Sequence, residues 1–185
     1  MKPIAAWSDE TVRPFSFPEP VKSVASPIVA IQNGAVGYEP GKPILKNLTL
    51  RIDEDDRIAL LGANGNGKST FCKLIGGRLA PLSGEMRRSS KLETAYFAQH
   101  QLDELRMEDT PVGHIRELMP DAPEARVRAR TAQVGFPANK ADTPVKNLSG
   151  GEKARLMLGI ATFGGPHLLI LDEPTNHLDI DSRTA

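Results

Sequence analysis

Three short segments, in a fixed order along the chain, constrain the fold more than any other feature. Residues 62–70 form a glycine-rich loop that ends in Gly-Lys-Ser-Thr, residues 148–152 read Leu-Ser-Gly-Gly-Glu, and residues 168–173 run from four apolar residues into an acidic pair. A glycine loop of this kind matches by chance at only roughly 3 in 100,000 positions of average composition. Three such segments in this order and spacing indicate one nucleotide-binding fold rather than coincidence.

The composition bounds the fold and leaves the partner open. With 185 residues, of which 39% are hydrophobic, the chain is long enough for one domain with a buried core. Lysine plus arginine and aspartate plus glutamate balance at 23 each, so an RNA partner is neither favoured nor excluded by net charge. Cys72 is the only cysteine, which fits the reducing cytoplasm. No apolar run approaches the length of about 20 residues that spans a membrane, so we expect a soluble, cytoplasmic chain.

Apolar patterning divides the chain into a proline-rich arm and an α/β domain. Residues 1–27 contain five prolines without helical or strand periodicity, so we predict an arm there and a domain over residues 28–185. Five segments have the apolar patterns of strands: residues 28–31, 45–52, 58–61, 92–97 and 168–171. The last is an unbroken apolar run, which is typical of a central parallel strand covered on both faces.

Helical patterns fill much of the remainder. A helix with one apolar face follows the glycine loop, because four apolar residues recur there at helical spacing: Phe71, Leu74, Ile75 and Leu79. Residues 100–147 are polar and helical, with Pro111 and Pro123 at first helical positions and Gly135 as a helix stop. A further helix begins near Gly151.

The glycine loop lies between a predicted strand and a predicted helix, which is the context that a phosphate-binding loop needs. Its glycines let successive N–H groups point at phosphate oxygens, and the helix dipole favours an anion. Lys68 would contact the β- and γ-phosphates of ATP, and the Ser69 hydroxyl would ligate Mg²⁺. The nucleotide-binding residues predicted here are Gly62, Ala63, Asn64, Gly65, Asn66, Gly67, Lys68, Ser69 and Thr70.

The acidic pair follows the last apolar strand. Asp172 is costly at the end of a buried strand unless it faces a cation, and Mg²⁺ supplies that cation. Glu173 beside it is able to accept a proton from an attacking water, and Pro174 stops the strand where the two carboxylates emerge. The plainer alternative is a helix-start pair after a strand.

Three other positions have weaker signals. Gln99, at the end of the strand predicted at residues 92–97, is a candidate neutral ligand for Mg²⁺ or the γ-phosphate, although a lone polar residue at a strand end is uninformative by itself. Tyr38 lies in a turn ahead of the loop; we favour stacking of its ring on adenine over simple cover of the hairpin. Ser149, followed by two glycines at a helix start, forms a second anion-binding arrangement, too far along the chain to serve the same phosphate in a compact monomer.

These segments together resemble the ABC-type ATP-binding domain of the P-loop NTPases over residues 28–185. Residues 62–70 resemble its Walker A loop, Gln99 its Q-loop, and residues 168–173 its Walker B strand. Its signature is matched by Leu148, Ser149, Gly150, Gly151 and Glu152, and its D-loop by Asn176, His177, Leu178 and Asp179. The resemblance implies an α/β fold with a parallel core sheet, an antiparallel β subdomain and a small helical subdomain at about residues 100–150.

In that family two domains pack head to tail and enclose ATP between one Walker A loop and the other domain's signature, so the signature here would serve a partner's nucleotide. Residues 172–179 resemble the ABC-F branch, which has tandem ATPase domains, no membrane segments and characterised members that act on the ribosome. Residues 15–20 resemble the end of the linker between the two ABC-F domains, and residues 96–101 suit the second domain. The resemblance implies ATP hydrolysis with Mg²⁺, a second ABC domain or a second copy as partner, and contact with the ribosome, its rRNA and tRNA.

The chain departs from the family pattern at its end. An ABC domain carries a switch histidine on a strand after the D-loop, and the chain ends at Ala185 before that position, so we expect a C-terminally truncated domain that is weak or inactive as an isolated ATPase. None of the four histidines takes that place: His100, His114, His167 and His177. Two other functions stay open: the ATPase subunit of a membrane ABC transporter, and a nucleotide-binding module without turnover.

Overall fold

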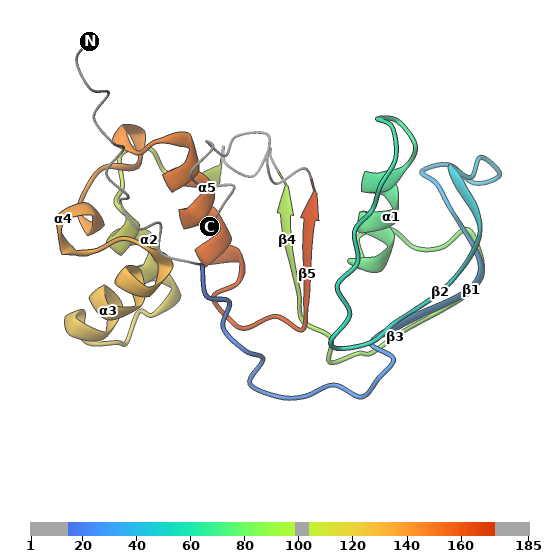
Figure 1. Ribbon diagram of the computed structural model, residues 1–185, viewed down its shortest axis with the longest axis horizontal. Helices are drawn as coiled ribbons and strands as arrows, with labels where there is room; N and C mark the ends of the chain where they lie inside the picture. The colour runs from blue at the N-terminus through green and yellow to red at the C-terminus, as the bar shows by residue number, and fades with distance from the viewer. Residues whose placement is uncertain (1–14, 99–103, 173–185) are drawn as a thin grey trace, which may run out of the picture. The chain divides into compact units, whose positions relative to one another are not determined.

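The computed structural model describes residues 15–98 and 104–172, which fall into two compact units (Figure 1). The sheet unit consists of residues 18–98 and 161–172, and the helical unit of residues 15–17 and 104–160. Each unit has its own buried side chains.

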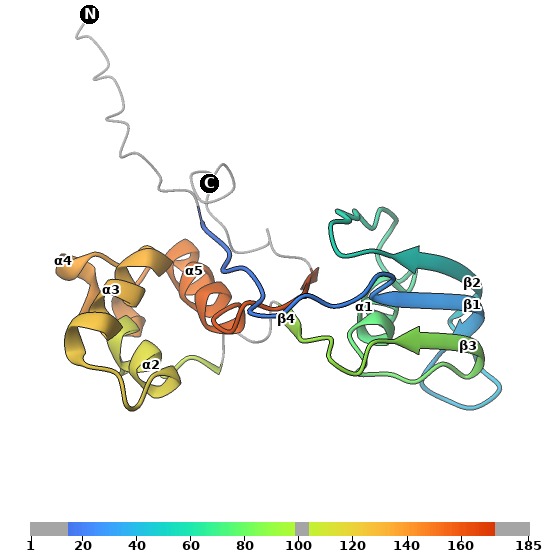
Figure 2. The ribbon, with the colours of Figure 1, turned by 90° about the horizontal axis from the view of Figure 1, so that it is seen from below.

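The sheet unit contains a three-stranded antiparallel sheet. Its strands are β1 (Val29–Val36), β2 (Leu45–Ile52) and β3 (Ser83–Arg88), and they lie side by side in the order β2-β1-β3 (Figure 2). A turn closed by a bridge between Glu39 and Lys42 joins β1 to β2. The strands predicted at residues 28–31 and 45–52 and the turn between them are confirmed.

Strand β3 is an element that the sequence does not predict. Met86 is its only apolar residue, and it pairs with Ile31 of β1. Glu85 and Arg87 flank Met86, and both are exposed. A short, charged strand at the edge of an antiparallel sheet needs little apolar alternation, since one face and one edge meet water.

A second, parallel pair of strands supports the candidate site. Strands β4 (Thr94–Ala98) and β5 (Leu168–Asp172) pair so that Tyr96 lies beside Ile170 and Ala98 beside Asp172. The strands predicted at residues 92–97 and 168–171 are therefore confirmed. The expectation that β5 is covered on both faces is wrong for the described residues, because Leu171 is 43% exposed and β4 is the one described strand that pairs with β5.

The strand predicted at residues 58–61 is also wrong. These residues have no strand conformation, and the exposed fractions are 57% for Ile58, 40% for Leu60 and 93% for Leu61. Apolar residues give a segment the propensity of a strand, but the strand forms only when its backbone groups find a partner in a ladder. No described strand pairs with this segment.

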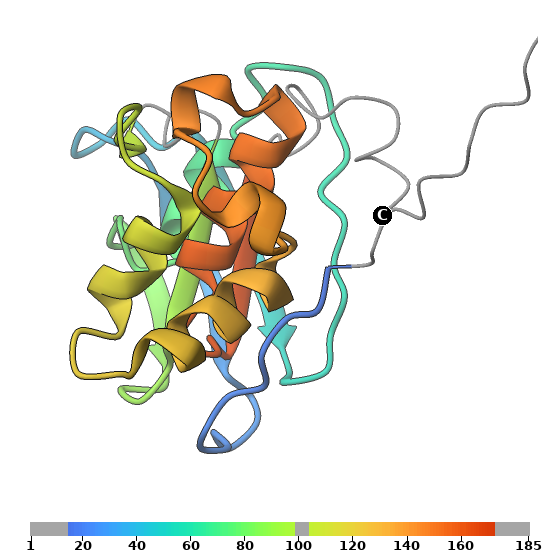
Figure 3. The ribbon, with the colours of Figure 1, turned by 90° about the vertical axis from the view of Figure 1, so that its left-hand side faces the viewer.

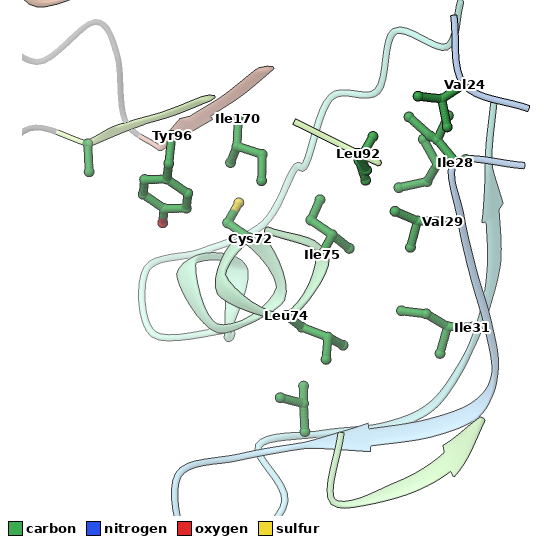
Figure 4. Close-up of a cluster of buried hydrophobic side chains, with 13 residues drawn as sticks. Val24, Ile28, Val29, Ile31, Cys72, Leu74, Ile75, Leu92, Tyr96 and Ile170 are labelled. Atoms are coloured by element: carbon green, nitrogen blue, oxygen red, sulfur yellow. The ribbon is translucent and has the colours of Figure 1, made fainter. Parts of the chain in front are cut away.

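Helix α1 (Lys68–Ile75) packs between β1 and the parallel pair in the core of the sheet unit (Figure 4). Leu74 is fully buried, which contributes about 1.5–3 kcal/mol. Gly76 and Gly77 end the helix, so Leu79 of the predicted apolar face lies beyond it. Burial raises the pKa of the Cys72 thiol to about 11, as expected for a packing residue. Val24, from the proline-rich arm, belongs to the same cluster.

The helical unit is built from short helices around a small core (Figure 3). Its elements are α2 (Pro111–Leu118), α3 (Glu124–Val134), α4 (Ala138–Ala141), a 3₁₀ turn (Val145–Asn147) and α5 (Gly150–Ala161). Pro111 begins α2 after a Thr110 side-chain cap, and Gly135 ends α3 with φ 110°, both as predicted. Gly159 allows α5 to approach α3 closely, because a Cβ there would lie 2.3 Å from Cγ1 of Val134.

Candidate functional site

The glycine loop leads into α1 through two left-handed backbone positions. Gly65 has φ 83° and Gly67 has φ 82°, a region that side-chain-bearing residues rarely occupy. A Cβ on Gly67 would also lie 2.9 Å from Cδ2 of Leu45, so the loop sits directly on the start of β2. Both the backbone conformation and the lack of space for a side chain therefore require glycine at position 67.

The N-terminus of α1 suits an anion. No side chain caps it and its first turn holds no acidic residue, so its N–H groups remain for a ligand. The Lys68 ammonium donates to the carbonyl oxygens of Gly62 at 2.8 Å and Ala63 at 3.0 Å, and an ammonium has a third N–H to offer. A pocket of about 200 Å³ at this place is lined by Ile44, Asn64, Gly65, Gly67, Lys68, Ser69 and Thr70.

The Ser69 hydroxyl and the Asp172 carboxylate meet at the end of β5. Ser69 Oγ donates to Oδ1 of Asp172 at 3.1 Å, across 103 residues of sequence. A hydroxyl and a carboxylate are hard oxygen ligands, and Mg²⁺ is commonly held by one or two such protein groups together with phosphates and water. The donor set therefore fits Mg²⁺ bound with a nucleotide. In the described part of the chain, no group of three or more His, Cys, Asp or Glu is arranged to hold a metal ion without one.

Tyr38 lies against helix α1. Its hydroxyl accepts from Lys73 Nζ at 3.1 Å, and the same ammonium lies 5.2 Å from the ring centroid. Hydrogen bonds from Lys73 and then Thr70 lower the pKa of the Tyr38 phenol. Tyr38 is 55% exposed, so part of its side chain remains accessible. Stacking on adenine stays a prediction, and Lys73 is a neighbour that the sequence patterns do not single out.

The signature residues of the helical unit form a capping box. Ser149 Oγ accepts from the N–H of Glu152 at 3.1 Å, and Glu152 Oε2 accepts from the N–H of Ser149 at 2.9 Å. Burial raises the pKa of Glu152, but hydrogen bonds from Lys140 and the Ser149 backbone outweigh it and lower the pKa overall. The box fixes the start of α5, where Gly150 and Gly151 follow Ser149.

We predict that Ser149→Ala destabilises the domain by about 1 kcal/mol, because the mutation removes the side-chain acceptor at the start of α5. The midpoint of thermal unfolding should fall by about 2–4 °C. Differential scanning calorimetry would measure it. Ser149→Asp is the matched control, since it retains a capping oxygen and should keep the wild-type midpoint. Equal midpoints for the Ala and Asp variants would contradict the capping role.

Several predicted site residues lie outside the described residues: Gln99, Glu173, Asn176, His177, Leu178 and Asp179. Sequence patterns also miss a residue that the structure adds to the site. The Tyr96 hydroxyl donates to Oδ2 of Asp172 at 2.9 Å. The sequence does place Tyr96 in a predicted strand. Only the parallel pairing of β4 with β5, however, brings the side chains of Tyr96 and Asp172 together.

A family model described as ABC transporter matches residues 45–176, which include the loop, the signature and the acidic strand. The chain belongs to the ABC transporter family. It is an ABC ATPase domain, and domains of this family bind ATP with Mg²⁺ and work with a second ABC domain. Among the described residues, no helix is long and apolar enough to cross a membrane.

Relatives confirm the resemblance to the ABC-F branch. The chain is 43% identical to "Probable ATP-binding protein YheS" of Haemophilus influenzae, over 93% of this chain and 28% of that protein. It is 42% identical to "ABC transporter F family member 3" of Arabidopsis thaliana, over 92% of this chain and 24% of that protein. The chain thus spans about a quarter of the length of these relatives.

Solved structures confirm the fold class. The structure of cbiO1 from Clostridium perfringens, described as part of the ABC transporter complex cbiONQ, matches with a TM-score of 0.67 and 25% identity, over 85% of this chain and 70% of that one. A bacterial Atm1-family ABC exporter with ATP bound matches with a TM-score of 0.67 and 24% identity, over 90% of this chain and 32% of that one, and shows the fold alone. The mixed α/β fold with antiparallel and parallel sheets is that of ABC ATP-binding domains.

Proposed function

We propose that this chain is an ATP-binding and hydrolysing domain of an ABC-F protein, which couples ATP turnover to ribosome binding and translation in the cytoplasm. The observation that carries the ATPase role is the meeting of Ser69 Oγ and Asp172 Oδ1 at 3.1 Å, beside the Lys68 ammonium. Lys68 and Ser69 line one pocket at the uncapped start of α1, and Asp172 is joined to it through its hydrogen bond with Ser69. Such preorganised charges are the main source of catalysis in phosphoryl transfer.

Each residue has a distinct role in this proposal. Lys68 would bind the β- and γ-phosphate oxygens. Ser69 and Asp172 would hold Mg²⁺, which would supply positive charge to the transferred phosphoryl group. Glu173 accepts the proton of the attacking water, because it follows Asp172 at the carboxyl end of the parallel strands, where ligands of such sheets bind. Gln99, which follows β4 in the sequence, would be a neutral ligand for Mg²⁺ or the γ-phosphate.

The composite interface is part of the proposal. The signature belongs to the helical unit and begins α5 in a capping box, which leaves the helix start of Gly150 and Gly151 rigid. We propose that this helix start faces the nucleotide of a second ABC domain, either in the same polypeptide or in a second copy. The proline-rich arm, residues 1–27, would be the end of the linker that joins two such domains, with the ATP-binding domain over residues 28–185.

The relatives support the ABC-F branch, and ribosome coupling is what the resemblance to that branch implies. The resemblance of residues 15–20 to the interdomain linker agrees with it. A transporter role has one observation in its favour, the fold match to cbiO1, whose structure is described as part of a transporter complex. A binding module without turnover is the third candidate.

Sedimentation separates the candidates. The full-length protein that contains this domain, with Glu173→Gln to retain ATP, should co-sediment with ribosomes in ATP and be released in ADP. Association with membranes alone would favour the transporter. ATP binding without phosphate release by the wild-type full-length protein would favour the binding module.

A further inference from the structure

Both oxygens of the Asp172 carboxylate accept a hydrogen bond from a hydroxyl. Oδ1 accepts from Ser69 at 3.1 Å, and Oδ2 accepts from Tyr96 at 2.9 Å. The two donors come from different elements, Ser69 from the first turn of α1 and Tyr96 from β4. The carboxylate is therefore held from two sides, and its orientation is fixed by more than its own strand.

Tyr96 is itself held firmly. Its side chain is only 6% exposed, and it lies next to Ile170 and Cys72 in the core of the sheet unit (Figure 4). Gly76 faces the ring, since a Cβ there would lie 3.6 Å from Cδ2 of Tyr96. The Arg78 guanidinium lies 4.1 Å from the ring centroid and stacks on its face. Because both the ring and the hydroxyl of Tyr96 have contacts, its orientation as a hydrogen-bond donor is well defined.

The Tyr96 and Ser69 hydroxyls do not compete for one carboxylate oxygen. Tyr96 donates to Oδ2 and Ser69 donates to Oδ1. The Tyr96 bond therefore leaves Oδ1 to the Ser69 hydroxyl, and Ser69 lines the pocket at the glycine loop.

We propose that Tyr96 is a positioning residue for Mg²⁺, which sets the metal affinity of the site by holding Asp172 through Oδ2. The inference rests on the proposed ATPase function. A cation that takes the Ser69 hydroxyl and Oδ1 breaks the Ser69–Asp172 hydrogen bond, while the Tyr96 bond to Oδ2 does not compete with it. Tyr96 therefore lowers the cost of ordering the carboxylate when the metal binds, which is preorganisation of a ligand by its neighbour.

The test is the Mg²⁺ dependence of ATP binding by the chain, measured with a fluorescent ATP analogue. Tyr96→Phe removes only the hydroxyl. We expect the Mg²⁺ concentration for half-maximal binding to rise about tenfold, the effect of losing one hydrogen bond to a charged group, with unchanged binding of the analogue in EDTA. Thr94→Val is the matched control: it removes a hydroxyl from the same strand that bonds Arg88 instead, and it should keep the wild-type Mg²⁺ dependence.

A double-mutant cycle with Asp172→Ala tests whether Tyr96 acts through that carboxylate. Tyr96→Phe should change nothing further in the Asp172→Ala background. A purely structural hydroxyl would lower the unfolding temperature and leave the Mg²⁺ dependence unchanged, and this result would overturn the proposal. A tenfold shift that persists without the Asp172 carboxylate would overturn it as well. Failure of the wild-type chain to bind the analogue at all would count against the proposed function instead.

Discussion

Glu173→Gln in the full-length protein should leave ATP binding intact and slow ATP hydrolysis about 10²–10⁴-fold, the usual contribution of a general base. Asp172 is the last residue of β5 and bonds Ser69 at the start of α1, and Glu173 follows it directly in the sequence. An amide has the same shape as the carboxylate but accepts no proton at neutral pH. Phosphate release measures the rate, and calorimetry measures the affinity for ATP.

Glu54→Gln is the control for that experiment. It makes the same chemical change at an exposed position between β2 and the glycine loop, and it should hydrolyse ATP at the wild-type rate. An unchanged rate in Glu173→Gln would remove Glu173 from the mechanism. A loss of ATP affinity in the same variant would assign it to binding rather than to proton transfer.

Lys68→Ala should weaken ATP binding about 10–150-fold. The ammonium lies across the loop within 3.0 Å of two loop carbonyls, so its loss removes a charge-assisted contact worth about 1.5–3 kcal/mol and leaves those carbonyls facing the phosphates. Isothermal titration calorimetry of the chain measures the change. Lys91→Ala, at an exposed turn, is the control. Unchanged affinity in Lys68→Ala would refute the loop assignment.

The parts of the fold that depend on local chemistry could be predicted from the sequence. Strand β2 alternates apolar and polar residues and has the predicted bounds. Helix α2 begins where Thr110 and Pro111 place it, since a capping hydroxyl and a fixed φ act within one turn. The parts of the fold that depend on pairing with a distant segment could not be predicted from the sequence. Strand β3 has little apolar content of its own, and residues 58–61 have the composition of a strand without a described neighbour to pair with.

The candidate site divides in the same way. The glycine loop and the acidic strand carry their chemistry in short motifs, so Lys68, Ser69 and Asp172 were identifiable before their proximity was known. Tyr96 was not, because its role depends on the parallel register that sets β4 beside β5. Ser149 was identified as an anion-binding hydroxyl, and the structure adds that it caps α5 together with Glu152, a role that stabilises the signature whatever it binds.

The segment at residues 58–61 links the glycine loop to the rest of the sheet unit. Its exposure determines how firmly it anchors the loop. Leu61, directly before the loop, is 93% exposed, so the loop is anchored firmly on its α1 side and weakly on this one. A strand that paired with residues 58–61 would restrict the loop, and a nucleotide on the loop would restrict it too. Each event lowers the entropic cost of the other, so we expect strand pairing at residues 58–61 and nucleotide binding to be positively cooperative.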